Sequence, residues 1–220
     1  PDTFRTSDIV DLGRHWLFTS PGVDGRCNST DDVHQAMAYD AGPTDAPIVL
    51  PGRVFAVLHD DARRVSGYIV NAANRTERVD ADFGNAVAVA AGSGAASLGL
   101  LGTGSVRHWV FTATTLASPL RRIFAHDLVG GGAATELASF ASGEVFLGAA
   151  TESGAMYIRL GNLSSGRVRV LRLDADLSIR EIATQTATGI LQGTELATPM
   201  RISDTRLVFA LTDVVYSVPK

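Results

Sequence analysis

The chain has 220 residues, 45% of them hydrophobic, and a formal net charge of −4. This size and composition allow a full core and exclude an intrinsically disordered protein. The scattered arginines and the acidic balance exclude an extended basic surface, so we expect no nucleic-acid partner. No apolar run reaches the ~18 residues that a membrane-spanning helix needs. The single cysteine, Cys27, excludes an intrachain disulfide.

The N-terminal residues 3–12 contain one short predicted strand, at residues 8–12. At the other end of the chain, residues 205–220 hold two predicted strands, which alone would leave an open sheet edge. We therefore expect residues 3–12 to pair with this last unit and to complete its sheet.

A hexapeptide recurs along the chain. The sequence RHWLFT of residues 14–19 returns as RHWVFT at residues 107–112, and weaker copies begin at Arg53, Ala155 and Arg206. Each copy is a short run of β-branched and aromatic residues, which predicts a strand. A repeat of roughly 40–50 residues with about four strands per unit indicates a β-propeller.

A second predicted strand follows each of the first four copies and ends in an acidic or amide residue. These residues are Asp40, Asn71, Asp127 and Asp174. Asp and Asn suit this position because their side chains bond the backbone two residues further on and close a turn. The strand that ends in Asp resembles the third strand of WD- or YVTN-type propeller blades. This resemblance implies a fold and no particular activity.

A third predicted strand follows each turn, at residues 48–50, 76–79, 135–137 and 179–182. An innermost strand fits at residues 86–91, 144–149 and 200–202. Unit two is irregular, because only Pro51 and Gly52 separate Arg53 from the preceding strand. Blade two therefore either lacks its innermost strand or is misaligned. The small residues of 92–104 form either a flexible loop or a tightly packed strand near the propeller axis.

We predict an all-β fold, with one β-propeller domain over residues 1–220 and about five blades of three to four antiparallel strands. The alternative is that the chain is the C-terminal part of a larger propeller. Trp16 and Trp109 are expected to fill the core between blades, with a sugar-stacking surface as the alternative. His15 and His108 point away from the tryptophans by the two-residue period of a strand, and we expect a structural role for them.

An acidic loop interrupts the first hairpin between residues 21 and 32. Asp24, Asn28, Asp31 and Asp32 place four oxygen-bearing side chains within nine residues. Ca²⁺ prefers six to eight oxygen ligands, often from one flexible loop. These four residues are therefore the candidate Ca²⁺ ligands, and a solvated turn is the alternative. The loop lacks the Asp spacing and the closing Glu of an EF-hand.

The sequence contains no Gly-x-Ser-x-Gly elbow and no zinc-ligand spacing, so no catalytic residue is assigned. The favoured function is a secreted, non-catalytic propeller module that binds a protein or glycan at one face. A propeller hydrolase of glycans or lactones with axial carboxylates is one alternative, and a structural module of an envelope or appendage assembly is another. The single lysine beside many Ala, Gly and Arg residues indicates a GC-rich, bacterial source, and we expect a secreted or periplasmic location.

Overall fold

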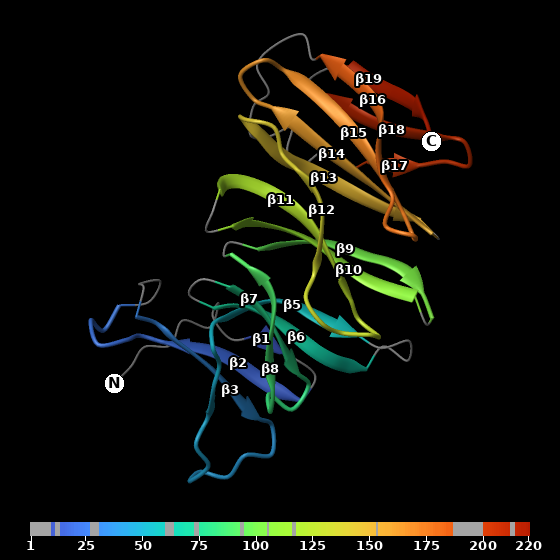
Figure 1. Cartoon of the computed structure of the whole chain (residues 1–220). Coiled ribbons are helices and arrows are strands. Elements are labelled where there is room, and N and C mark those ends of the chain that lie inside the picture. Colours follow the sequence, from blue (N-terminus) through green and yellow to red (C-terminus); the bar gives the residue numbers. More distant parts are fainter. Residues whose placement is uncertain are drawn as a thin grey trace. The chain divides into compact units, whose positions relative to one another are not determined.

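The computed structural model describes residues 10–11, 14–26, 31–59, 64–72, 75–92, 95–104, 106–115, 118–152, 154–186, 200–211 and 214–220. In this part of the chain every regular element is a β-strand, and the strands form five antiparallel sheets of three or four strands (Figure 1). The all-β prediction is confirmed. None of the described segments is a helix that is long and apolar enough to cross a membrane. The chain divides into two compact units, residues 1–93 and 94–220.

The first unit contains two four-stranded sheets, each built from consecutive strands. The first sheet consists of β1 (Val10–Asp11), β2 (His15–Ser20), β3 (Val33–Ala38) and β4 (Ile48–Val49). The second consists of β5 (Arg53–His59), β6 (Val65–Ala72), β7 (Arg75–Asp80) and β8 (Ala86–Ala91). Because side chains alternate along a strand, one face of each sheet can pack on the other. The core between them is formed by Leu17, Ala36, Leu50, Tyr68, Val70, Val79 and Phe83.

The second unit contains three sheets, again of consecutive strands. The third sheet consists of β9 (Ala96–Thr103), β10 (Val106–Thr115), β11 (Ser118–Asp127) and β12 (Thr135–Ser139). The fourth consists of β13 (Glu144–Glu152), β14 (Ala155–Asn162), β15 (Arg167–Asp174) and β16 (Ile179–Thr186). The last consists of β17 (Arg201–Ile202), β18 (Arg206–Leu211) and β19 (Val214–Pro219). The fourth sheet packs on both neighbours, with Met156 and Ile158 on one face and Tyr157 and Val170 on the other.

The predicted alignment of the second sequence repeat, which begins at Arg53, was shifted by one strand. The copies at residues 14, 107, 155 and 206 lead into the second strands of their sheets, whereas Arg53 begins β5, the first strand of its sheet. The second sheet therefore has all four strands, and residues 86–91 form its fourth strand rather than an innermost strand of the next sheet. The first strand of the third sheet is β9, within the small-residue segment 92–104.

The end of the third strand carries a recurring turn. Asp80 takes the place predicted for Asn71, because β7 rather than β6 is the third strand of its sheet. The Asp80 carbonyl accepts a hydrogen bond of 2.8 Å from the N–H of Phe83, which has a φ of 61°. The Asp174 carbonyl accepts one of 2.9 Å from Leu177, with a φ of 67°. In each turn the residue with the positive φ, Phe83 or Leu177, is apolar and packs against the hydrophobic core of its own unit.

The N-terminal strand lies in the first sheet. Val10 pairs with Leu17 and Asp11 with Trp16, so β1 is an edge strand of the first sheet, beside β2. The prediction that the N-terminal strand pairs with residues 205–220 is therefore wrong for Val10 and Asp11. Residues 3–9 and 12 lie outside the described part of the chain. The last sheet has three described strands, and β19 is its third.

A buried arginine joins the fourth and last sheets. Arg159 of β14 is 0% exposed, and its Nη2 donates to the carbonyl of Leu147 at 3.1 Å. Leu147 is the bulged residue of β13, which has no partner in the ladder between Phe146 and Gly148. Nη1 of Arg159 donates to the carbonyl of Ala210 at 3.4 Å, and its guanidinium lies 5.4 Å from the centre of the Phe209 ring. Burial lowers the pKa of Arg159 from its ordinary value.

We expect Arg159→Ala to lower the free energy of unfolding by about 3 kcal/mol, because it opens a cavity and leaves buried carbonyls without donors. Arg159→Met keeps most of the volume and removes the buried charge, so its loss should be about 1 kcal/mol. Urea unfolding measures both, with the exposed Arg180→Ala as the control that stays within about 0.5 kcal/mol. A wild-type midpoint for Arg159→Ala would show that this contact stabilises nothing.

Candidate functional site

The acidic loop is partly described, since Asn28 lies outside the described residues. The carboxylate of Asp31 accepts a hydrogen bond of 3.1 Å from the N–H of Asp24, and Asp24 in turn accepts one of 2.8 Å from the N–H of Arg26. These carboxylates therefore close the turns of their own loop. In the described segments no three His, Cys, Asp or Glu side chains group as a metal site. Ca²⁺ binding by Asp24, Asn28, Asp31 and Asp32 stays a prediction.

An aromatic pair lies open on the first sheet. Trp16 of β2 is 45% exposed and Tyr39, just after β3, is 44% exposed. Their ring centres lie 4.8 Å apart with a tilt of 41°. Phe18 and Met37 are half-buried on the same side of the sheet, because Trp16 pairs with Met37 and Phe18 follows two residues later. We call this surface of Trp16, Phe18, Gln35, Met37 and Tyr39 the head face.

The head face lies opposite the face that packs on the second sheet. Leu17 and Ala36, which pair with each other, belong to the buried core of the unit. The acidic loop begins at the far end of β2, four residues after Trp16, which is about 13 Å along a strand. The prediction that a partner surface lies near residues 21–32 therefore concerns a different end of the hairpin from the aromatic pair.

Residues equivalent to Trp16 are buried in the other four sheets. Equivalent positions follow from the strand register. In each sheet the last residue of the third strand pairs with a residue of the second strand, as Asp127 pairs with His108 and Asp80 with Gly67. The residue that follows this partner is the equivalent of Trp16. The equivalent residues are Tyr68 at 1%, Trp109 at 1%, Met156 at 0% and Leu207 at 0% exposed. Trp109 is a core filler as predicted, with its ring 4.0 Å from that of Phe111. The same prediction does not hold for Trp16 within the first unit, because the second sheet packs on the opposite face of the first sheet.

The last sheet has an open face of its own. Leu207, Phe209 and Val218 pack on the fourth sheet, and the residues between them point the other way. Val215 is 70% exposed, whereas Ile123, which holds the same position in the third sheet, is 0% exposed. Val208 is half-buried. We call the surface of Val208, Ala210, Val215 and Ser217 the tail face.

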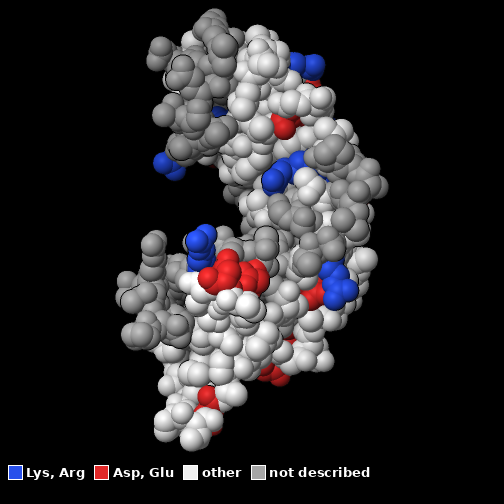
Figure 2. Space-filling model, turned by 90° about the vertical axis from the view of Figure 1, so that its left-hand side faces the viewer, with Lys and Arg blue, Asp and Glu red and all other residues white. Residues whose placement is uncertain are grey.

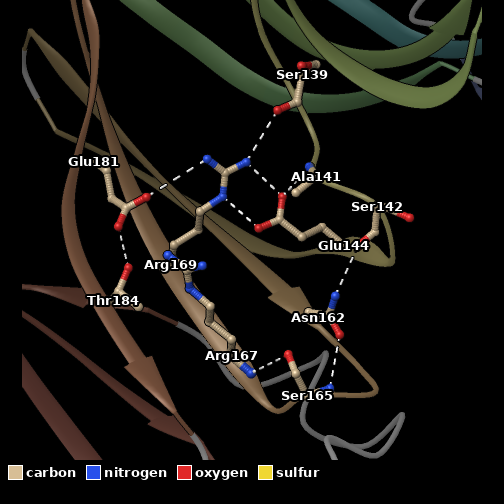
Figure 3. Close-up of polar contacts among 10 residues, drawn as sticks. All are labelled: Ser139, Ala141, Ser142, Glu144, Asn162, Ser165, Arg167, Arg169, Glu181 and Thr184. Atoms are coloured by element: carbon tan, nitrogen blue, oxygen red, sulfur yellow. Dashed lines mark hydrogen bonds and ion pairs between the residues drawn. The ribbon is translucent and has the colours of Figure 1, made fainter.

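A charged network supports the fourth sheet (Figure 3). Arg169 of β15 holds Glu144 of β13 with two hydrogen bonds of 2.7 Å, donates to the carbonyl of Ser139 at 3.3 Å, and lies 4.0 Å from Glu181. Burial alone would raise the pKa of Glu144. The bonds from Arg169 and from the N–H of Ala141 outweigh that effect and hold this pKa below its ordinary value.

A second polar cluster lies at the opposite end of the same sheet. The hydroxyl of Tyr157 donates to Glu152 at 2.8 Å, and Nζ of Lys220 donates to the same carboxylate at 2.7 Å. Burial, together with the bond to Glu152, raises the pKa of Tyr157 to about 12. The bond from Lys220 lowers the pKa of Glu152, and that from Tyr157 adds to the effect. Both groups therefore stay in their ordinary charge states at neutral pH. Arg172 and Asp174 form an adjacent ion pair, with 2.7 Å between Nη2 and Oδ1.

Charge gathers in no single large region of the face drawn in Figure 2, where acidic and basic side chains lie in small groups. His15 lies edge-on to the ring of Phe83 at 5.0 Å, which fits the predicted structural role. The comparisons with known proteins add no identification: neither a protein-family model nor a curated protein matches the chain.

Loss of the Glu144–Arg169 pair should change the pH dependence of stability. Folding lowers the pKa of Glu144. The contribution of its carboxylate to the free energy of unfolding is therefore fully present above the pKa of an unfolded Glu, about 4.3, and is lost as the pH falls through the lower folded value. We expect the stability of Glu144→Gln to fall less steeply than that of the wild type below about pH 5. Unfolding by urea at a series of pH values measures this.

Glu136→Gln is the matched control, because Glu136 also pairs with an arginine, Arg122, but is 42% exposed. An exposed pair contributes little, so its pH profile should follow the wild type. Parallel curves for Glu144→Gln and the wild type would contradict a special role for the buried pair.

Proposed function

We propose that this chain is a secreted or periplasmic, non-catalytic binding module of the β-propeller type, with its five sheets as blades. Consecutive antiparallel sheets and the hexapeptide repeat support the propeller, since each sheet is one meander and the sheets within each compact unit pack face to face. The observation that carries the binding function is the exposure of Trp16, at 45%, in a position that is buried in every other sheet.

An open aromatic surface of this kind is suited to hold a partner. Trp and Tyr combine a large apolar area with a polar tip, and they dominate the energetics of protein interfaces. Covering the exposed parts of Trp16 and Tyr39 would contribute roughly 1–2 kcal/mol each from burial alone. Phe18 and Met37 extend the surface along the two strands. The head face is therefore the proposed binding surface, and an apolar protein surface is the partner chemistry that it fits.

The structural-module alternative has support from a separate observation, the tail face. A component of an assembly is expected to carry such exposed apolar side chains, of which Val215 of the last sheet is one. The hydrolase alternative and the Ca²⁺ site have no such observation in their favour, and they stay predictions. In the fourth sheet, Glu152 and Asp174 are each paired with a cation.

Tryptophan fluorescence tests whether the head face is open. The chain has two tryptophans, so Trp109→Phe leaves Trp16 as the sole emitter. We expect emission typical of a water-exposed indole and efficient quenching by acrylamide in dilute solution. We also expect the wild type to enhance the fluorescence of anilinonaphthalene sulfonate, and Trp16→Ser to reduce that enhancement, because the dye binds exposed apolar surface. A blue-shifted, unquenched Trp16 in the dilute monomer would overturn the proposal.

Stability measurements supply the control. Trp16→Ser should change the free energy of unfolding by less than about 0.5 kcal/mol, because an exposed side chain contributes little to the core. Trp109→Ser should lower it by about 3–5 kcal/mol, because the same residue type is removed from a buried site. Equal losses for the two variants would place Trp16 in the core.

A further inference from the structure

We infer that Lys220 and Glu152 form an acid-sensitive latch between the last sheet and the fourth sheet. All contacts of this latch lie inside the second compact unit. Nζ of Lys220, which follows β19, donates to Oε2 of Glu152, the last residue of β13, at 2.7 Å. The side chain of Lys220 is 15% exposed and that of Glu152 is 30% exposed. A charge-assisted bond in such a partly desolvated place is stronger than one in open water.

The backbone holds both ends of the latch in place. The N–H of Lys220 donates to the carbonyl of Thr205 at 3.2 Å, next to the start of β18. Glu152 pairs with Ala155 in the tight hairpin that joins β13 to β14. Because each partner sits at the end of a paired strand, the bond links the last sheet to the fourth sheet and not merely two mobile side chains.

The carboxylate of Glu152 lies in a balanced cluster of charges. Three described groups act on it: Lys220, Tyr157 and Arg172. The hydroxyl of Tyr157 donates to Oε1 of the carboxylate at 2.8 Å. Arg172 lies 5.8 Å from the centre of the Tyr157 ring and forms an ion pair with Asp174. At neutral pH the cluster therefore holds two cations and two carboxylates.

Acid removes one side of this balance. The bond from Lys220 lowers the pKa of Glu152, so the latch is fully formed above the pKa of an unfolded Glu, about 4.3, and is lost as the pH falls through the lower folded value. Protonation then leaves Lys220 and Arg172 as two cations against Asp174. β17, which also lies beside β13, adds a further cation, the exposed Arg201. Acid therefore loosens the contact between the two sheets.

Two other polar links between the same sheets do not respond to acid. Nη1 of Arg159 donates to the carbonyl of Ala210 at 3.4 Å, and the hydroxyl of Tyr216 donates to the carbonyl of Thr186 at 3.5 Å. Carbonyl and Tyr hydroxyl groups gain no proton in this pH range, and arginine stays charged. The latch is thus the link among these three that acid opens. Its opening exposes apolar side chains of the last sheet, Leu207, Phe209 and Val218.

Hydrogen exchange read by mass spectrometry tests the latch, with rates corrected for the intrinsic effect of pH. Between pH 7 and pH 3 we expect the protection of residues 206–219 to fall about tenfold further than that of β10, because one charge-assisted bond is lost. Lys220→Gln and Glu152→Gln should each show this loss of protection at pH 7 already. Both variants should also lose the additional pH dependence of this segment.

Matched variants separate the ion pair from general damage. Lys220→Arg keeps the charge, so it should keep the protection of residues 206–219 at pH 7. The double variant Lys220→Gln/Glu152→Gln should lose no more protection than either single variant, because both changes remove the same bond. Glu136→Gln removes the more exposed partner of Arg122 and should follow the wild type.

Three outcomes would contradict the latch. The first is an equal loss of protection in residues 206–219 and β10 of the wild type between pH 7 and pH 3. The second is a wild-type profile in Lys220→Gln. The third is a double variant that loses the sum of the two single losses, which would show that the residues act separately. None of these results bears on the head face, because Trp16 lies in the other compact unit.

Discussion

Sheet-on-sheet packing is the constraint on which the structure depends. A strand places alternate residues on opposite faces, so a sheet that is apolar on both faces needs a neighbour on each side. The fourth sheet meets this condition, with Met156 buried on one side and Tyr157 on the other. In the first sheet Leu17 is buried against the second sheet, whereas the adjacent residue, Trp16, is 45% exposed. Within the first unit, the head face therefore has no neighbouring sheet.

The buried polar groups of the second unit follow from the same packing. The bulge in β13 leaves Leu147 outside the ladder, and its carbonyl needs a donor inside the contact between two sheets. Arg159 supplies that donor from the adjacent strand and reaches Ala210 of the next sheet. At the rim of the same sheet, Arg169 pairs with Glu144 at the start of β13. Polar side chains therefore hold the sheets in register where backbone pairing ends.

The local sequence predicted where strands lie better than it predicted which place each strand takes in its sheet. The hexapeptide correctly located β2 and β10, because apolar and β-branched residues favour a strand wherever it lies. It misplaced Arg53, since the run Val-Phe-Ala-Val of β5 has the same pattern as a second strand, and only its tertiary neighbours make it the first. The equivalent of Trp16 in that sheet is Tyr68, which follows Gly67 rather than an Arg-His pair. Alignment on the turn at Asp80 would have found it.

The candidate site escaped prediction for a related reason. The hexapeptides that contain Trp16 and Trp109 are identical at five of six positions, so no local property separates the exposed ring from the buried one. What separates them is the tertiary surroundings of each ring, and a strand pattern carries no information about those. A residue that stabilises the core at one position is therefore exposed at the equivalent position, where we propose that it binds a partner. Changing the partner of a sheet changes the role of its side chains without any change in the hexapeptide that positions them.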